Sequence, residues 1–263
     1  AYTPWEWHKP IFKFASKLGL IYFSTPFDNT AVDFLETLNV PAYKVASFEI
    51  TDLPLIKKIS STGKPLIIST GMASFEEIKE AVSVAKKNGS GPIALLKCTS
   101  SYPAEAKNSN LMTIPFLRKK FNCEVGLSDH TISNSSAISS IAYGATIIEK
   151  HLTINRKKKG IDNFFSSDPS NFQNLVKNVN EAFKAKGKIF FGPTKDEKKL
   201  IKYRRSLYVI QNLKKNEKIS KKNTLAIRGG KGLAPKYLFK ILGKKVKREI
   251  KKGTPIKIKD IKK

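Results

Sequence analysis

The chain has 263 residues, enough to bury one large domain, or a medium domain with a small one. No apolar run approaches the roughly 20 residues that a membrane-spanning helix needs, and the opening AYTPWEWHKP lacks the basic and apolar parts of a signal peptide. With only two cysteines, Cys98 and Cys123, we expect no disulfide framework and a reducing, cytoplasmic location.

The net charge of +28 raises the question of a polyanionic partner. Six of the 49 basic residues are arginine, which leaves 43 lysines. Arginine is the residue that makes bidentate contacts to bases and phosphates, and the lysines here are not interleaved with aromatic residues. We interpret the charge as a compositional bias and expect no nucleic-acid and no membrane partner, while a basic polyanion-binding protein stays open as an alternative.

Short apolar runs alternate with longer amphipathic stretches over most of the chain. The short runs predict strands at 20–24, 43–47, 66–70, 93–99, 125–128 and 146–151. The amphipathic stretches predict helices at 10–18, 29–38, 53–61, 74–88, 114–121, 134–143 and 170–186. Buried strands that are each followed by a helix indicate a parallel sheet covered by helices.

Six strand–helix pairs fit either an open sheet or most of an eight-stranded barrel. Each predicted strand ends in residues suited to chemistry: Thr25, Ser47 with Glu49, Ser69, Thr99 with Ser100, Ser128 with His130, and His151. A barrel gathers ligands from many strand ends around one mouth, whereas an open sheet gathers them at one switch point. The sequence therefore predicts an α/β fold, a (β/α)8 TIM barrel over residues 1–190 that lacks its N-terminal strands. We expect two strands and a helix to precede Ala1.

The pattern changes after the last helix. Residues 191–205 are predicted to form a linker, with a turn at Gly192-Pro193. From 206 to 263, the runs SLYVI and TLAIR, the glycine-rich GGKG and the segment LGKKVKREIKKGTPIKI predict a small, β-rich second domain.

Two of the three histidines end neighbouring predicted strands, His130 in GLSDHT and His151 in IEKHLT. Imidazole is a good ligand for Mn, Fe, Co or Zn, and Asp129 or Glu149 could orient a ligating ring. The alternative is that each histidine forms an ordinary hydrogen bond in a partly buried strand. The paired positions favour a metal site, and His8, which has no partner in the pattern, is interpreted as structural or superficial.

A second group consists of hydroxyls and one lysine. Its members are Thr25, Lys44, Ser47, Ser69, Ser100 and Ser128. A lysine within a buried strand is costly unless it meets an anion, and hydroxyls near it would complete a phosphate or carboxylate site. Hydroxyls at strand ends also cap the helices that follow them, and the residues alone leave both interpretations open.

Several segments together resemble a known family. They are STPFD (24–28), YKVASFE (43–49), ISTGMAS (68–74), LKCTSSYP (96–103), GLSDHT (126–131) and IEKHLT (148–153). In their order and spacing they resemble the sialic acid synthase family. The opening YTPWEWH and the segment ASFEITD are most similar to its pseudaminic acid synthase branch. The C-terminal segments AIRGGKGLAPKYL and KREIKKGTPI are similar to the antifreeze-like (SAF) domain of these enzymes.

The resemblance implies a phosphoenolpyruvate-dependent synthase that forms pseudaminic acid from an amino-sugar aldehyde, for surface glycans or flagellin. His130 and His151 match the ligands of a divalent metal, manganese first, with magnesium or cobalt as alternatives. The residues that match phosphoenolpyruvate-binding positions are Thr25, Lys44, Ser47, Ser69, Ser100 and Ser128. Glu49 matches a catalytic position near the sugar. The other matches to the sugar site are Tyr102, Asp162 and Arg228, the last reaching in from the partner of a domain-swapped homodimer.

Two departures from the family pattern concern loops. Ile161 replaces the proline of a Gly-Pro-Asp motif, and RGGKG (228–232) stands where Arg-Pro-Gly is usual. Three alternatives remain: an N-acetylneuraminate or legionaminate synthase, an inactive fragment, and the polyanion-binding protein.

Overall fold

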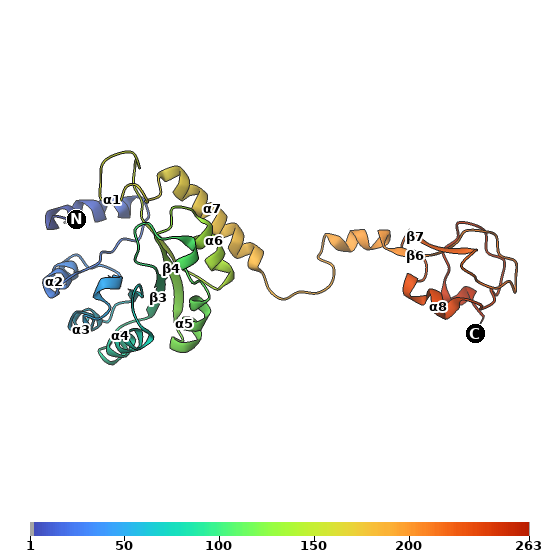
Figure 1. Cartoon of the computed structure of the whole chain (residues 1–263), viewed down its shortest axis with the longest axis horizontal. Coiled ribbons are helices and arrows are strands. Elements are labelled where there is room, and N and C mark those ends of the chain that lie inside the picture. The colour runs from blue at the N-terminus through green and yellow to red at the C-terminus, as the bar shows by residue number, and fades with distance from the viewer. Residues whose placement is uncertain (1–2, 263) are drawn as a thin grey trace. The chain divides into compact units, whose positions relative to one another are not determined.

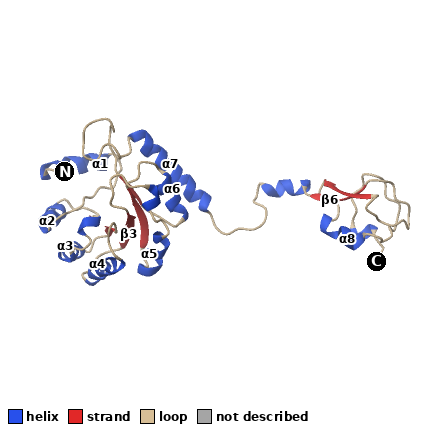
Figure 2. Cartoon of the chain, in the orientation of Figure 1, coloured by secondary structure: helices blue, strands red, loops and turns tan. Residues whose placement is uncertain are grey.

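The computed structural model describes residues 3–262, so that Tyr2 of the opening motif lies outside the described residues. The chain divides into two compact units, Ala1–Lys188 and Ile189–Lys263. In the first unit a sheet is surrounded on its outer side by an arc of helices (Figures 1 and 2).

The strands of the first unit are β1 (Tyr43–Val45), β2 (Leu66–Ser69), β3 (Ile93–Cys98), β4 (Glu124–Asp129) and β5 (Ile148–Lys150). Its α-helices are α1 (Trp5–Lys17), α2 (Asn29–Thr37), α3 (Leu53–Ser60), α4 (Phe75–Lys87), α5 (Thr113–Phe121), α6 (Ser135–Ala142) and α7 (Pro169–Lys186). Two 3₁₀ turns, η1 (Ser47–Glu49) and η2 (Ala106–Asn108), follow β1 and β3.

The five strands form one parallel sheet in chain order, from β1 to β5. Their register places Ser69 beside Leu96, Cys98 beside Ser128, and Ser128 beside Glu149. Parallel strands joined by helices on their outer side are the barrel-type α/β architecture that the sequence predicts. The parallel register also brings the carboxyl ends of all five strands to the same edge.

The predicted strand at 20–24 is wrong. Within residues 3–262 no backbone ladder pairs this segment with β1, and Ile21 is 82% exposed. Tyr22 instead stacks on Phe12, with ring centroids 4.5 Å apart. The run has the composition of a strand, but it is held by side-chain packing because no neighbouring strand satisfies its backbone.

Most helices begin close to their predicted positions because residues with capping side chains precede them. The Ser74 hydroxyl accepts from the Glu77 amide and the Glu77 carboxylate accepts from the Ser74 amide, a capping box that starts α4. The carboxylates of Asp52 and Asp168 cap α3 and α7 by accepting from the backbone amide three residues further along. Helix α1 differs, because it begins at Trp5 and contains Pro10 in its interior.

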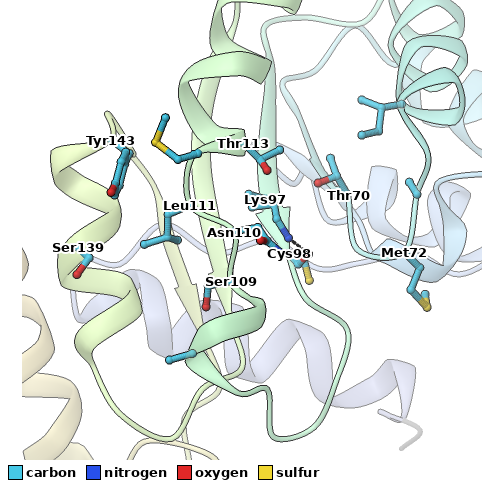
Figure 3. A pocket seen from close by; sticks show the side chains of 14 residues that line it. Thr70, Met72, Lys97, Cys98, Ser109, Asn110, Leu111, Thr113, Ser139 and Tyr143 are labelled. Carbon is cyan, nitrogen blue, oxygen red and sulfur yellow. Dashed lines mark hydrogen bonds between the residues drawn. The ribbon is translucent and has the colours of Figure 1, made fainter.

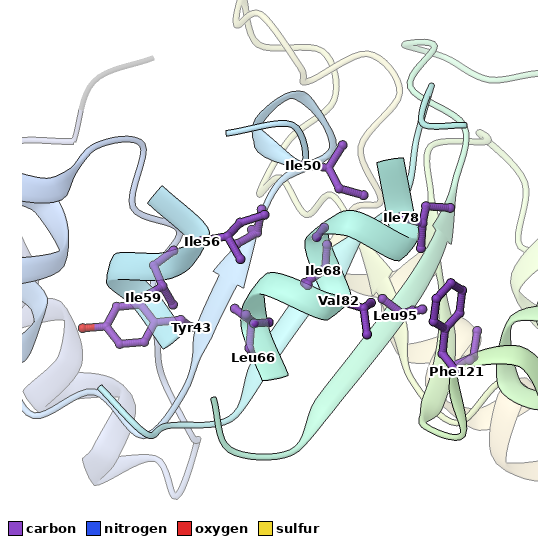
Figure 4. Packing of buried hydrophobic residues seen from close by; sticks show 14 of the residues in the cluster. Tyr43, Ile50, Ile56, Ile59, Leu66, Ile68, Ile78, Val82, Leu95 and Phe121 are labelled. Carbon is purple, nitrogen blue, oxygen red and sulfur yellow. The ribbon is translucent and has the colours of Figure 1, made fainter. Parts of the chain in front are cut away.

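The core of the first unit lies between the sheet and the helices (Figure 4). Tyr43, Val45, Leu95 and Val125 are fully buried there from three different strands. Burying one such side chain contributes about 1.5–3 kcal/mol. Because side chains alternate along a strand, the residues between these positions point to the opposite face of the sheet.

The second unit is built around β6 (Arg205–Val209) and β7 (Thr224–Arg228), which pair antiparallel. Isolated bridges such as Leu213 to Ile250 extend the pairing. Its short helices are η3 (Glu197–Tyr203), η4 (Pro235–Tyr237), α8 (Leu238–Ile241) and η5 (Ile258–Asp260). The residues of its own core are Leu207, Val209, Leu213, Ile219, Ile241, Val246, Ile250, Ile256 and Ile261. Within residues 3–262, no helix has the length and apolar character needed to cross a membrane.

Candidate active site

One face of the parallel sheet carries a polar group from every strand. The alternation that buries Val45 and Val125 against the helices sends Lys44 and Ser128 to the other face. The same rule places Ser69, Cys98 and Glu149 on this face, followed by His130 and His151 just beyond the ends of β4 and β5. Residues far apart in the sequence are thus brought to one end of the sheet.

Lys44, Ser128 and Glu149 form a connected set. The Lys44 ammonium lies 3.4 Å from Glu149 Oε2, and the Ser128 hydroxyl donates to Glu149 Oε1 at 2.7 Å. Lys44 and Ser128 are both buried, whereas the Glu149 side chain is 41% exposed. Glu149 therefore holds the lysine and the serine from the open side, where an anionic ligand would share or replace its contacts.

Hydroxyl groups converge on Gly71, at the end of β2. Its amide donates to Ser47 Oγ at 3.0 Å, and a Cβ at this position would lie 2.7 Å from Ser47 Oγ and closer still to Ser100 Oγ. The buried Ser69 hydroxyl forms no hydrogen bond within the described part of the chain. An unsatisfied buried hydroxyl beside a glycine that leaves room is suited to accept an anion, because it offers a donor with no competing partner.

The two imidazoles of His130 and His151 lie side by side, with ring centroids 5.2 Å apart. His130 is buried, and its Nδ1 lies 3.0 Å from the Thr99 carbonyl, which can only accept. This contact places the proton on Nδ1 and leaves the Nε2 lone pair available to a metal. Cation–nitrogen distances of about 2.1 Å are compatible with this ring separation.

The pair fits a divalent cation that keeps open positions. Within residues 3–262, no group of three or more His, Cys, Asp or Glu side chains is arranged to hold a metal ion. The protein would therefore supply two nitrogens, and water or substrate oxygens would supply the remaining positions. Asp162 Oδ2 lies 3.7 Å from His151 Nδ1, on the side of this ring.

Asp129 does not orient a histidine, contrary to one of the two candidates for that role. Its Oδ2 lies 2.7 Å from the Lys150 ammonium, and both side chains are 2% exposed. Asp129 Oδ1 accepts from the Thr131 amide and Lys150 donates to the Thr131 carbonyl. Alternation places this pair on the helix side of the sheet, where it ties the end of β4 to the end of β5.

Aromatic rings border the imidazoles. The Tyr102 ring centroid lies 4.4 Å from that of His130, and the buried Phe165 ring lies 4.9 Å from that of His151. Cys98 Sγ lies 3.8 Å from His130 Nδ1. Burial alone would raise the pKa of the Cys98 thiol, but contacts with His130 and Ser47 outweigh it and lower the pKa to about 7.

Glu49 follows β1 in η1, and its Oε2 is buried without a hydrogen-bond partner among the described residues. Burial raises the pKa of this carboxyl group, although the Lys44 ammonium acts in the opposite direction. A carboxyl group that keeps its proton to higher pH is suited to proton transfer.

Thr25 and Arg228 are two further residues that the sequence predicts for the site. Thr25 lines a cavity of about 320 Å³ with Trp5, His8 and Asp28. Arg228 is exposed at the end of β7 in the second unit. Within residues 3–262, Thr25 forms no hydrogen bond with either histidine.

The sequence did not indicate Cys98 or Phe165 as site residues. It predicted that Glu149 orients a histidine, whereas Glu149 contacts Lys44 and Ser128. Cys98 precedes Ser100 by two residues, so the period of a strand could have placed both on one face. The partners of Glu149 lie 21 and 105 residues away in sequence. A local sequence pattern does not predict contacts between residues so far apart.

The comparisons with known proteins decide the family. Residues 1–190 match the NeuB family, and residues 204–262 match the SAF domain. The chain belongs to the NeuB family. The predicted membership of the sialic-acid-synthase type of enzyme, with a C-terminal SAF domain, is thereby confirmed.

Members of the family are similar over most of this chain. A pseudaminic acid synthase of Helicobacter pylori is 40% identical over 264 residues, which cover 99% of this chain and 77% of that protein. An N,N'-diacetyllegionaminic acid synthase of Campylobacter jejuni is 37% identical over 90% of this chain and 72% of its own length. A crystal structure of N-acetylneuraminic acid synthetase from Leptospira borgpetersenii, in complex with citrate, has a TM-score of 0.72 and 34% identity, covering 77% of this chain and 70% of that one. The predicted fold class is confirmed.

Proposed function

We propose that this chain condenses phosphoenolpyruvate with an open-chain 2,4-diacetamido-2,4,6-trideoxy hexose, giving pseudaminic acid and inorganic phosphate for a surface glycan or flagellin. The observation that supports this best is the placement of Lys44 and Ser69 on the sheet face that also carries the His130–His151 pair, the Ser69 hydroxyl having no hydrogen-bond partner among residues 3–262. An anion site next to two available imidazoles is what a reaction between an enol phosphate and an aldehyde requires.

Phosphoenolpyruvate would bind at the hydroxyl-lined end of the sheet. The Lys44 ammonium would pair with its phosphate or carboxylate. The supporting hydroxyls would be those of Ser47, Ser69, Ser100 and Ser128, which converge from four different segments. Fixed donors of this kind hold the enol carbon in attack geometry without further reorganisation.

The sugar would bind beside the histidines, between Tyr102 and Asp162. A divalent cation at the two imidazoles, manganese in our proposal, with magnesium or cobalt as alternatives, would polarise the aldehyde carbonyl. The phenol and carboxylate would orient the sugar hydroxyls and amides through hydrogen bonds.

In the reaction, the enol carbon of phosphoenolpyruvate forms the new carbon–carbon bond with the aldehyde carbon. Water adds to the second carbon of the former enol, and phosphate then leaves by cleavage of its C–O bond. Glu49, which keeps its proton to higher pH than an exposed glutamate, is our candidate for the group that holds and moves a proton.

The branch of the family is tested by comparing sugars. The full chain is incubated with phosphoenolpyruvate, Mn²⁺ and the precursor of pseudaminic acid, of N,N'-diacetyllegionaminic acid or of N-acetylneuraminic acid, and products are measured by mass spectrometry. We expect kcat/KM to be at least roughly tenfold higher for the first sugar. Turnover of N-acetylmannosamine alone would contradict the pseudaminate assignment, and preference for the legionaminate precursor would support the second candidate, which the 37% identical relative favours.

We also propose a domain-swapped homodimer in which Arg228 of one protomer completes the sugar site of the other. The exposed position of Arg228 at the end of β7 leaves its guanidinium available to donate hydrogen bonds to hydroxyl and amide oxygens of the sugar. We place the reaction in the cytoplasm, where a chain with two free cysteines stays reduced.

A further inference from the structure

An open cavity of about 840 Å³ lies beside the C-terminal part of β3 (Figure 3), and its lining includes both Lys97 and Cys98. Leu95 packs into the core between sheet and helices, so Lys97, two residues further along the strand, points to this same side. In Figure 3 Lys97 lies between Thr70 and Leu111. The volume is in the range of small-molecule sites.

Lys97 has an unusual environment for a lysine. Its ammonium donates to the Cys98 carbonyl at 2.7 Å and to Thr99 Oγ1 at 3.4 Å. Within residues 3–262 it forms no ion pair with a carboxylate, unlike Lys44 and Lys150. Burial lowers the pKa of Lys97, which reflects the cost of keeping a cation there without a counter-charge.

The rest of the lining indicates what would pair with this cation. Hydroxyl and amide groups come from Ser109, Asn110 and Thr113, and apolar surface comes from Met72 and Met112. Lys97 is the single charged side chain among the lining residues of the described chain. One cation favours a singly charged ligand, and the apolar wall favours one with a hydrocarbon part.

We propose that this cavity binds a small monocarboxylic acid, with its carboxylate paired to Lys97 and its hydrocarbon part against Met72 and Met112. Binding there does not depend on the proposed reaction, although Cys98 both lines the cavity and contacts His130. Thr99 also connects the cavity with the histidine pair. Its carbonyl contacts His130, and its hydroxyl accepts a hydrogen bond from Lys97.

The composition of the chain provides a direct probe. Its two methionines, Met72 and Met112, both line the cavity. The full chain is labelled with ¹³C at the methionine methyl groups and titrated with acetate, butyrate and hexanoate, and with 1-hexanol as the uncharged comparison. We expect saturable shifts of both methyl signals with hexanoate, and an affinity about tenfold higher than for butyrate because two more methylenes are buried.

The role of the charge is tested by Lys97→Gln, which keeps a donor for the Cys98 carbonyl. We expect hexanoate to bind at least about tenfold more weakly to this variant, and Lys97→Arg to restore binding. Lys79→Gln, a matched change at an exposed lysine of α4, should leave the affinity unchanged. If Lys97→Gln does not fold, the comparison of hexanoate with 1-hexanol in the unchanged chain decides.

Three results would overturn the proposal: no saturable shift of the two methionine signals, equal affinity for 1-hexanol and hexanoate, or unchanged hexanoate affinity in Lys97→Gln. In each case Lys97 would only cover apolar surface with its hydrocarbon stem.

Discussion

At the scale of single residues, the Glu49 carboxyl group is the clearest target for a test of proton transfer. Its Oε2 is buried with no hydrogen-bond partner in the described part of the chain, and burial raises the pKa of the carboxyl group above the ordinary value of 4.5. The folded chain therefore binds this proton more tightly than the unfolded chain does. The sign follows from linkage: the stability that Glu49 contributes is present at low pH and decreases as pH rises above the unfolded pKa.

Glu49→Gln should act in opposite directions on stability and activity. We expect the thermal stability of the variant, relative to that of the unchanged chain, to increase as the pH rises from 4 to 8. Circular dichroism would follow the thermal unfolding of both chains. Its kcat should decrease by a factor of roughly 10²–10⁴, the usual contribution of a general acid or base. Glu76→Gln at an exposed position is the control, and a variant with full activity would exclude Glu49 as the proton carrier.

Gly71→Ala probes the anion site. The added methyl group would lie 2.7 Å from Ser47 Oγ, so the Ser47 and Ser100 hydroxyls must rotate away from the bound phosphate. We expect KM for phosphoenolpyruvate to rise by about tenfold, the effect of one or two weakened hydrogen bonds to a charged group, with an unchanged sugar KM. An equal rise of both KM values would instead indicate a general distortion of the sheet end.

At the scale of elements, β4 and β5 carry the two imidazoles, and the buried Asp129–Lys150 pair joins their ends. Lys150→Met removes one partner and leaves an uncompensated buried carboxylate. We expect this change to lower the free energy of unfolding by about 3–5 kcal/mol, measured by urea titration. The double variant Asp129→Leu/Lys150→Met should recover much of that loss, and a double variant as unstable as the single one would show that the pair is not the cause.

The sequence predicts the elements better than it predicts their pairing. Helix caps and strand alternation are local signals, and they place α4 and β3 correctly. The segment 20–24 failed because a strand exists only where a neighbour satisfies its backbone. Glu149 and Asp129 were assigned to the histidines, yet one contacts Lys44 and the other Lys150. These partners are set by register across strands, which residue spacing does not report.

At the scale of the whole molecule, the proposed swap makes a prediction about mixed chains. Arg228→Ala and His130→Ala should each be inactive alone. In a mixed dimer, one site would combine an intact first unit from the Arg228→Ala chain with an intact Arg228 from the His130→Ala chain. When equal amounts of the two variants are mixed and their subunits exchange, we expect about one quarter of the activity of the unchanged chain. Half of the dimers would then be mixed, and each mixed dimer would hold one complete site. No recovery, with dimers present by light scattering, would contradict the swap.

Phosphate release from phosphoenolpyruvate in the presence of the amino sugar directly measures the reaction proposed at His130 and His151. With the unchanged chain, we predict one phosphate per molecule of nonulosonic acid, loss of the reaction after chelation, and recovery with Mn²⁺. His130→Ala and His151→Ala should each lower kcat/KM by at least roughly 10³, because the aldehyde would lose its polarising ligand. Equal rates in the unchanged chain and both variants, or phosphate release that needs no sugar, would contradict the account.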